Sequence, residues 1–225
     1  TDGLSDPPAY FPENARINKA GYADISEIMK RNLKPLSVTE FMHQTESGAL
    51  ILDTRHQDIY EKGSVPGSLN IGLDGQYAVW VGTLINFGQP LVLVTNPGAE
   101  EESVLRLARV GFENVQGYLD GGIDAWKAHN KQVDIVRSIA AEEASQLIQQ
   151  GTATLDVRNN TETQTLHVQD TVNLPLKDLK DNLHQLNEEK QYVLFCAGGY
   201  RSMIAASILK AKGYTNFVHV YGGFN

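Results

Sequence analysis

The sequence predicts an α/β fold of two similar units, each a mainly parallel sheet flanked by helices. Short apolar runs of strand length alternate with longer amphipathic segments, which is typical of parallel strands joined by crossover helices. A duplication of segments along the chain indicates two copies of this plan. The chain has 225 residues, 41% of them hydrophobic, which is enough for two ordinary cores. We therefore expect a connector arm at residues 1–35, a first domain at 36–134 and a second at 135–225.

The duplication consists of four pairs of matching segments. They are Leu50–Arg55 with Ala153–Arg158, Leu91–Val94 with Tyr192–Phe195, Arg109–Val115 with Ala211–Phe217, and Tyr118–Gly122 with His219–Gly223. Asp53 then corresponds to Asp156, and Gly111 to Gly213, so the period is about one hundred residues. A constant period over four segments predicts that both halves share one fold.

Local signals place the elements of the arm and the first unit. Ser37 stands three residues before Glu40, a capping-box pattern that begins a helix. Apolar runs bounded by polar or glycine residues indicate buried strands, and apolar positions at helical spacing indicate helices. We expect helices around Asp24–Asn32, after Ser37, over Glu101–Val110 and over Ile123–Ala128, and strands over Ala49–Asp53, Pro90–Thr95 and Asn114–Tyr118.

The second unit repeats this order after a linker at Lys127–Ser138. We expect helices over Ala141–Gln149 and Ser202–Lys212, and strands over Thr152–Val157, Tyr192–Phe195 and Asn216–Val220. In the first copy, Gly121-Gly122 precedes a helix, whereas the printed chain stops soon after Gly222-Gly223. The second copy is therefore expected to lack its last helix, and the chain is expected to be a fragment of a longer protein.

The only cysteine of the chain, Cys196, follows a predicted strand and opens a short loop that Arg201 closes. In open parallel sheets, binding sites lie beyond the carboxyl ends of the strands. Gly198 and Gly199 allow the loop amides to converge, and the following helix adds its positive end, so both favour an anionic sulfur. The pattern favours a reactive thiolate that needs no histidine base. The alternative is an inert, buried cysteine.

The segment Cys196–Ser202 resembles the active-site loop of the rhodanese family of sulfurtransferases. In that family the cysteine accepts a sulfane sulfur as a persulfide and passes it to a nucleophile. Cys196 and Arg201 are separated by four residues, whereas the related tyrosine and cell-cycle phosphatases have five. The resemblance therefore favours a sulfurtransferase over a phosphatase or arsenate reductase. Val65–Ile71 and the Asp-X-Arg and Gly-Gly segments of each unit are also typical of rhodanese modules.

The resemblance assigns roles to residues of the second unit. Cys196 and Arg201 are the expected catalytic residues, with Arg201 pairing with the anionic donor. The expected substrate-binding residues are Ala197, Gly198, Gly199, Tyr200 and Ser202, and the expected structural pair is Asp156 and Arg158. The implied partners are a small-molecule sulfur donor, such as thiosulfate or a low-molecular-weight persulfide, and an acceptor thiol or cyanide. No cofactor is implied for this chain. A non-catalytic rhodanese-like module that positions a partner domain is the alternative function.

The corresponding loop of the first unit, Thr95–Ser103, has neither cysteine nor arginine. Three glutamates, Glu100 to Glu102, stand at the position where the second copy has the end of its anion-binding loop. Their negative charges would repel an anion. The first unit is therefore expected to be inactive. It would support the second unit, or its acidic loop would line the approach to the active site or contact a partner.

Composition excludes several classes of function. The net charge is −8, most of it in residues 1–134, which disfavours nucleic acid and anionic membranes as partners. The six histidines are scattered without metal-ligand spacing, so we expect no metal site. No apolar run is long enough to span a membrane and no signal peptide is visible, so a cytoplasmic location is expected. Trp80 and Trp126 are expected in the core or at a domain interface.

The opening segment Leu4–Asn18 resembles the connector that follows the metallo-β-lactamase-like domain in fusions of persulfide dioxygenases with rhodanese modules. Such a fusion would place a mononuclear iron in a domain that precedes this chain and couple sulfur transfer to persulfide oxidation. The alternative is a proline-rich arm that packs on the first domain.

Overall fold

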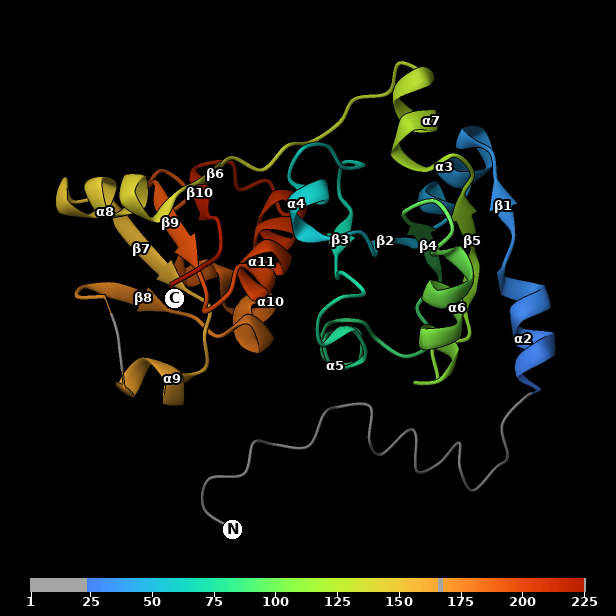
Figure 1. The fold of residues 1–225 in the computed structure, drawn as a ribbon, viewed down its shortest axis with the longest axis horizontal. Coiled ribbons are helices and arrows are strands. Elements are labelled where there is room, and N and C mark those ends of the chain that lie inside the picture. The colour runs from blue at the N-terminus through green and yellow to red at the C-terminus, as the bar shows by residue number, and fades with distance from the viewer. Residues whose placement is uncertain (1–23, 166–167, 225) are drawn as a thin grey trace, which may run out of the picture. The chain divides into compact units, whose positions relative to one another are not determined.

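The computed structural model describes residues 24–165 and 168–224 (Figure 1). The chain forms two compact units. The first comprises the described residues up to Arg55 together with Leu73–Lys131, and the second comprises His56–Gly72 and the described residues from Gln132 onward. The described residues form two five-stranded sheets, which confirms the predicted α/β class. The resemblance at Leu4–Asn18 lies outside the described residues.

The first unit follows the predicted order of elements. Its helices are α2 (Ile25–Asn32), α3 (Val38–Glu46), α5 (Tyr77–Leu84), α6 (Glu100–Ala108) and α7 (Gly122–Ala128). Its strands are β1 (Pro35–Leu36), β2 (Leu50–Asp53), β4 (Leu91–Val94) and β5 (Val115–Leu119). The first sheet has the order β1-β5-β4-β2-β3, where β3 is Leu69–Asn70. The capping box at Ser37 and Glu40 is present as predicted.

The second unit carries the second sheet, in the order β6-β10-β9-β7-β8. Its strands are β6 (Ser138–Ile139), β7 (Ala153–Asp156), β8 (Thr171–Asn173), β9 (Tyr192–Phe195) and β10 (Phe217–Val220). Its helices are α4 (Gln57–Tyr60), α8 (Ala141–Gln149), α9 (Asn160–Thr165), α10 (Leu179–Asn182) and α11 (Tyr200–Ala211), with 3-10 turns η1 (Leu176–Asp178) and η2 (Leu183–Gln185). The pairs of β9 with β7 and with β10 are parallel, so their carboxyl ends lie at one edge.

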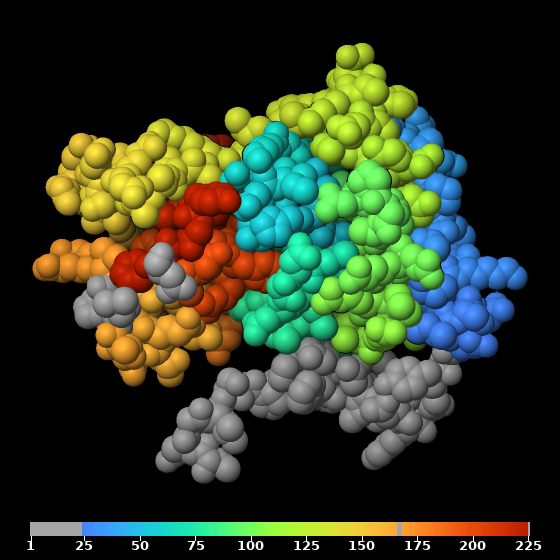
Figure 2. All heavy atoms as spheres, viewed as in Figure 1, coloured from blue at the N-terminus to red at the C-terminus, as the bar shows by residue number. Residues whose placement is uncertain are grey.

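The two faces of the second sheet differ in what covers them. Val193 and Phe195 of β9 and Val218 and Val220 of β10 pack on the α8 side. In Figure 2 the yellow residues of α8 lie beside the red residues near the C-terminus. Because side chains alternate along a strand, His219 lies on the opposite face. That face is covered by α11, which contacts both β9 and β10.

Three differences from the sequence predictions bear on the site. Helix α11 begins at Tyr200 and not at Ser202, because Gly199 has a φ of +84° and turns the chain into the helix one residue before it. Arg201 and Ser202 therefore lie in its first turn. The predicted linker begins too early, since Lys127 lies within α7. The sequence did not predict α9, which has no buried residue and hence no apolar period.

Trp80 and Trp126 are buried, as expected of core residues. None of the helices within residues 24–165 and 168–224 combines the length and apolar character that a bilayer-spanning helix requires. In the same ranges, no group of three or more His, Cys, Asp or Glu side chains is arranged to hold a metal ion.

Candidate active site

Cys196 lies directly after β9, at the carboxyl edge of the second sheet, and opens the loop that leads into α11. It is only 1% exposed. The Ser202 hydroxyl in the first turn of α11 donates to the Cys196 Sγ, with 3.4 Å between Oγ and Sγ. The loop therefore folds back so that the start of the helix faces the sulfur, and a helix N-terminus favours an anion there.

The turn after β10 holds the beginning of this loop. The Phe224 N–H donates to the carbonyl oxygens of Cys196 and Ala197, at 2.8 and 3.2 Å. Gly223 has a φ of +77°, and a Cβ at this position would lie 2.5 Å from each of the same two oxygens. Only glycine can occupy this position without displacing the loop, so the Gly-Gly of the second repeat acts directly on the cysteine loop.

Arg201 forms an ion pair that sequence reasoning missed. Its guanidinium binds the Glu162 carboxylate of α9 with two hydrogen bonds of 2.6 and 2.8 Å. The hydrogen bond to Arg201 lowers the pKa of Glu162, and the same bond raises the pKa of Arg201. No local pattern singles out Glu162, since it lies in a short, polar helix 39 residues from Arg201.

Asp156 and Arg158 form a buried ion pair at the end of β7. Arg158 Nε lies 2.9 Å from Asp156 Oδ2, and Nη2 lies 2.7 Å from the same oxygen. The Arg158 guanidinium also lies over the Phe224 ring, 4.8 Å from its centroid. The pair is therefore linked to the residue whose backbone holds the cysteine loop. Tyr200, also assigned to the site, donates its hydroxyl to the Gly72 carbonyl at 2.8 Å.

His219, which the sequence left without a function, lies beside the same loop. It is 1% exposed, and its Nε2 lies 2.9 Å from the Ser202 Oγ and 3.2 Å from the Gly199 carbonyl oxygen. Burial lowers the pKa of His219 to about 4. The imidazole is therefore neutral at physiological pH, although it is linked through Ser202 to the sulfur.

In the first unit, Glu100 to Glu102 form the first turn of α6. Carboxylates there stabilise the helix, but they replace the positive end that would attract an anion. Thr95 stands at the position of Cys196 by the repeat. The helix still retains a buried serine, Ser103, whose Oγ lies 3.0 Å from the Thr54 hydroxyl. The loop of the first unit therefore has the same place between a strand and a helix, but it lacks the thiol and the guanidinium of the second unit.

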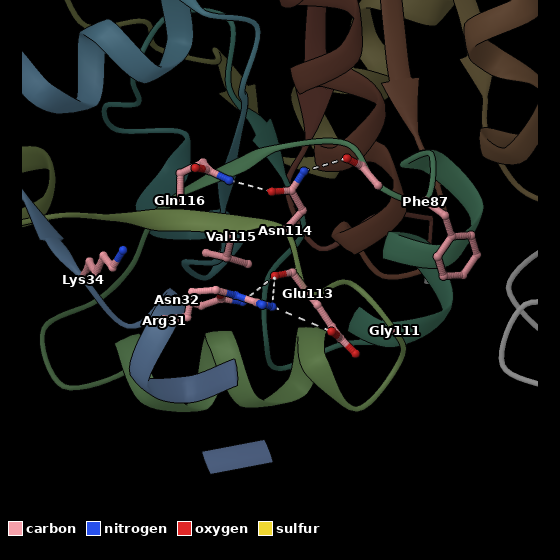
Figure 3. A pocket seen from close by; sticks show the side chains of 10 residues that line it. Arg31, Asn32, Lys34, Phe87, Gly111, Glu113, Asn114, Val115 and Gln116 are labelled. Atoms are coloured by element: carbon pink, nitrogen blue, oxygen red, sulfur yellow. Dashed lines mark hydrogen bonds and ion pairs between the residues drawn. The ribbon is translucent and has the colours of Figure 1, made fainter. Parts of the chain in front are cut away.

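A cavity of about 700 Å³ opens in the first unit (Figure 3). Its lining residues are Arg31, Asn32, Lys34, Phe87, Gly88, Gly111, Glu113, Asn114, Val115 and Gln116. Some polar side chains of the lining bind one another: Arg31 pairs with Glu113 at 3.7 Å, and Asn32 donates to the Glu113 carbonyl at 2.7 Å. Every lining residue belongs to the first unit, so this cavity is separate from the cysteine loop.

Comparison with known proteins decides the family. Residues 37–129 and 140–225 each match the family model described as "Rhodanese-like domain". The chain belongs to the rhodanese-like family. Each of its two rhodanese-like domains has a five-stranded parallel sheet flanked by helices, as the resemblance implied.

Named relatives match one part of the chain each. "Thiosulfate sulfurtransferase GlpE" of Pseudomonas savastanoi pv. phaseolicola is 32% identical over 88 residues, covering 39% of this chain and 83% of that protein. "Putative sulfur carrier protein YrkF" of Bacillus subtilis is 32% identical over 69 residues, covering 31% of this chain and 37% of that protein. A crystal structure of a rhodanese-related protein from Thermoplasma volcanium is 31% identical with a TM-score of 0.34, covering 39% of this chain and 85% of that chain.

Among the site residues predicted for the second rhodanese-like domain, the structure brings Cys196 and Ser202 into contact. It places Arg201 in the same first turn of α11, bound to Glu162. Asp156 and Arg158 pair with each other at the end of β7. Glu162 and His219 are the neighbours that sequence reasoning did not connect to the site.

Proposed function

We propose that the second rhodanese-like domain is a sulfurtransferase that carries sulfane sulfur on Cys196, and that the first domain is inactive. The observation that carries the proposal is the position of Cys196 at the carboxyl end of β9, facing the first turn of α11. The relative named thiosulfate sulfurtransferase supports the same reaction class. The proposed donor is thiosulfate or a low-molecular-weight persulfide, and the acceptor is a thiol or cyanide.

The reaction proceeds in two displacements. The Cys196 thiolate attacks the outer sulfur of thiosulfate, a new Sγ–S bond forms, and the old S–S bond breaks to release sulfite with the electron pair. The acceptor then attacks the terminal sulfur of the persulfide, and the Cys196 thiolate leaves. The amides of residues 197–202 and the N-terminus of α11 stabilise the persulfide anion. Arg201 attracts the anionic donor. The transfer needs only the chain's own residues, donor and acceptor.

Mass spectrometry of the intact protein tests this proposal. After incubation with thiosulfate and removal of the excess, the wild-type chain should gain one sulfur, about 32 Da, and cyanide should remove it. Cys196→Ser should show no gain. A wild-type chain that stays unmodified by thiosulfate and by glutathione persulfide would favour the alternative, a binding module that positions a partner. Phosphate ester hydrolysis without sulfur transfer would instead indicate a phosphatase.

The ion pair with Glu162 predicts an effect on donor affinity. Glu162 competes with the anionic donor for Arg201, so Glu162→Gln is expected to lower the KM for thiosulfate about fivefold with little change in kcat. This corresponds to the roughly 1 kcal/mol of a partly exposed ion pair. Steady-state kinetics at low ionic strength measure it. Glu143→Gln is the matched control, because it removes an exposed glutamate that pairs with Arg137 at 2.8 Å. A KM that rises in Glu162→Gln would show that Glu162 positions Arg201 and does not compete.

Two finer aspects of the proposal come from the sequence alone. A reducing compartment such as the cytoplasm suits a single reactive thiolate. A preceding metallo-β-lactamase-like domain with iron would couple the sulfur transfer to persulfide oxidation. The proposal of such a domain rests only on the resemblance of Leu4–Asn18 to a connector segment.

A further inference from the structure

Five polar side chains of the second unit form one continuous chain of contacts that ends at the cysteine. Ser202 Oγ lies 3.4 Å from Cys196 Sγ and 2.9 Å from His219 Nε2. On the other side of the ring, His219 Nδ1 lies 2.9 Å from Ser138 Oγ, and the Ser138 hydroxyl donates to the Glu61 carboxylate. Both nitrogens of the imidazole are therefore engaged, one toward the sulfur and one toward a carboxylate.

Burial changes along this chain of contacts. Cys196, Ser202 and His219 are buried, whereas Ser138 and Glu61 are only half-buried. A thiol that is 1% exposed has little direct access to water, and it must lose its proton before it can attack a donor. The contacts therefore join a buried group that must release a proton to a carboxylate that can exchange one with solvent.

Each hydroxyl in the series has one hydrogen, so the directions of the hydrogen bonds are coupled. With a Cys196 thiol, Ser202 donates to Nε2, Nδ1–H donates to Ser138, and Ser138 donates to ionised Glu61. With a Cys196 thiolate, Ser202 donates to the sulfur, Nε2 carries the imidazole hydrogen, and Ser138 donates to Nδ1. Glu61 is then protonated. The Gly199 carbonyl lies 3.1 Å from Ser202 Oγ and 3.2 Å from Nε2, so in the thiolate arrangement it can accept the Nε2 hydrogen.

We propose that His219 is a positioning residue in a proton relay that carries the Cys196 proton through Ser202 and Ser138 to Glu61. The inference rests on the proposed function. The S–H bond breaks, one hydrogen moves at each of the three intermediate groups, and one O–H bond forms at Glu61. Nothing is oxidised or reduced, and His219 changes tautomer without becoming charged.

The charges around His219 suit this neutral exchange. Burial lowers its pKa to about 4, while Asp58 and the Gly199 carbonyl act in the opposite direction. Asp58 lies in α4 and accepts a hydrogen bond from Tyr221, which follows β10. On the side of the sulfur, Arg201 of α11 adds a positive charge that interacts with Cys196. Burial therefore keeps the imidazole neutral, and the positive charge of Arg201 lies at the sulfur end of the series, where the relay would leave a negative charge.

The first unit lacks the relay although it shares the scaffold. His219 is paired with Ser138 between β10 and β6. Tyr118 is paired with Pro35 between β5 and β1, at the corresponding positions of the first sheet. Proline has no hydroxyl, and Thr95 stands in place of the cysteine. The relaying groups thus occur in the copy that has a thiol to ionise.

The test measures the pH dependence of Cys196 alkylation by iodoacetamide, which needs no sulfur donor. In His219→Gln, the amide cannot take up a proton at one end and release one at the other. With iodoacetamide in large excess, so that loss of the thiol proton limits the reaction, the variant is expected to react about tenfold more slowly at pH 7, where the relay supplies the route for the proton. At pH 10 the rates of the two proteins should be similar. Glu61→Gln should also slow the reaction at pH 7, and the matched carboxylate variant Asp58→Asn should leave that rate within about twofold.

A double-mutant cycle separates a relay from a general loss of structure. In a Ser202→Ala background, His219→Gln should have no further effect, because the route to the sulfur is already broken. Additive effects, an unchanged rate at pH 7 in His219→Gln, or an equal loss of rate at every pH would overturn the relay. The persulfide adduct from thiosulfate tests the proposed function independently: a wild-type adduct with an unchanged His219→Gln rate at pH 7 refutes the relay alone. A slowed His219→Gln reaction at pH 7 without a wild-type adduct refutes the sulfurtransferase alone.

Discussion

Cys196→Ser is expected to lower the kcat/KM for thiosulfate:cyanide sulfurtransfer at least about a thousandfold. The hydroxyl is close to the thiol in size, and the Ser202 contact at 3.4 Å leaves room for it, so the fold should persist. Serine is much harder to ionise than cysteine, and its oxygen does not accept and release sulfane sulfur as a thiolate does. The measurement is thiocyanate formation at saturating cyanide, with the thermal midpoint recorded for both proteins.

The repeat provides a matched control for this substitution. Thr95 stands in the first domain where Cys196 stands in the second. Thr95→Ser should leave sulfurtransfer within about twofold of the wild-type rate, because we propose that the first domain is inactive. Substantial activity in Cys196→Ser, or its loss in Thr95→Ser, would place the reaction in the first domain and contradict the assignment.

Gly223→Ala is expected to lower the free energy of unfolding by about 3 kcal/mol or more and to reduce sulfurtransfer strongly. Its Cβ would meet the carbonyl oxygens of Cys196 and Ala197 at 2.5 Å, and both belong to backbone that cannot rotate away. The loop must shift to relieve the contact, and this moves the sulfur relative to the N-terminus of α11. Urea unfolding and kcat/KM measure the two effects.

Gly222→Ala isolates the steric part of this effect. Gly222 has a φ of +71° and Gly223 a φ of +77°, but a Cβ on Gly222 meets nothing within 4 Å. Both variants carry the cost of a left-handed alanine, about 1 kcal/mol, and only Gly223→Ala adds the clash with the cysteine loop. Equal losses of stability and activity in the two variants would show that backbone conformation alone accounts for the result.

Much of the fold could be predicted because its signals are local. Strands β4, β7 and β9 are short, mostly apolar runs of strand length. Helix α8 was predicted at Ala141–Gln149, which is its observed range. The position of Cys196 at a strand end follows from the same signal, since β9 ends at the preceding residue. By contrast, α9 has no buried residue and β6 has only two residues. Neither therefore produces a hydrophobic pattern that can be distinguished from the flanking sequence.

The sequence by itself therefore determined the duplicated α/β plan, the position of the cysteine loop after a strand, and the absence of the cysteine from one copy. These depend on residues that are neighbours along the chain or related by the repeat. Only the tertiary structure decided what surrounds the sulfur. Glu162 reaches Arg201 across 39 residues, and Glu61 reaches Ser138 across 77. Contacts at such separations arise from the packing of strands and helices, and no local period or motif encodes which side chains that packing brings together.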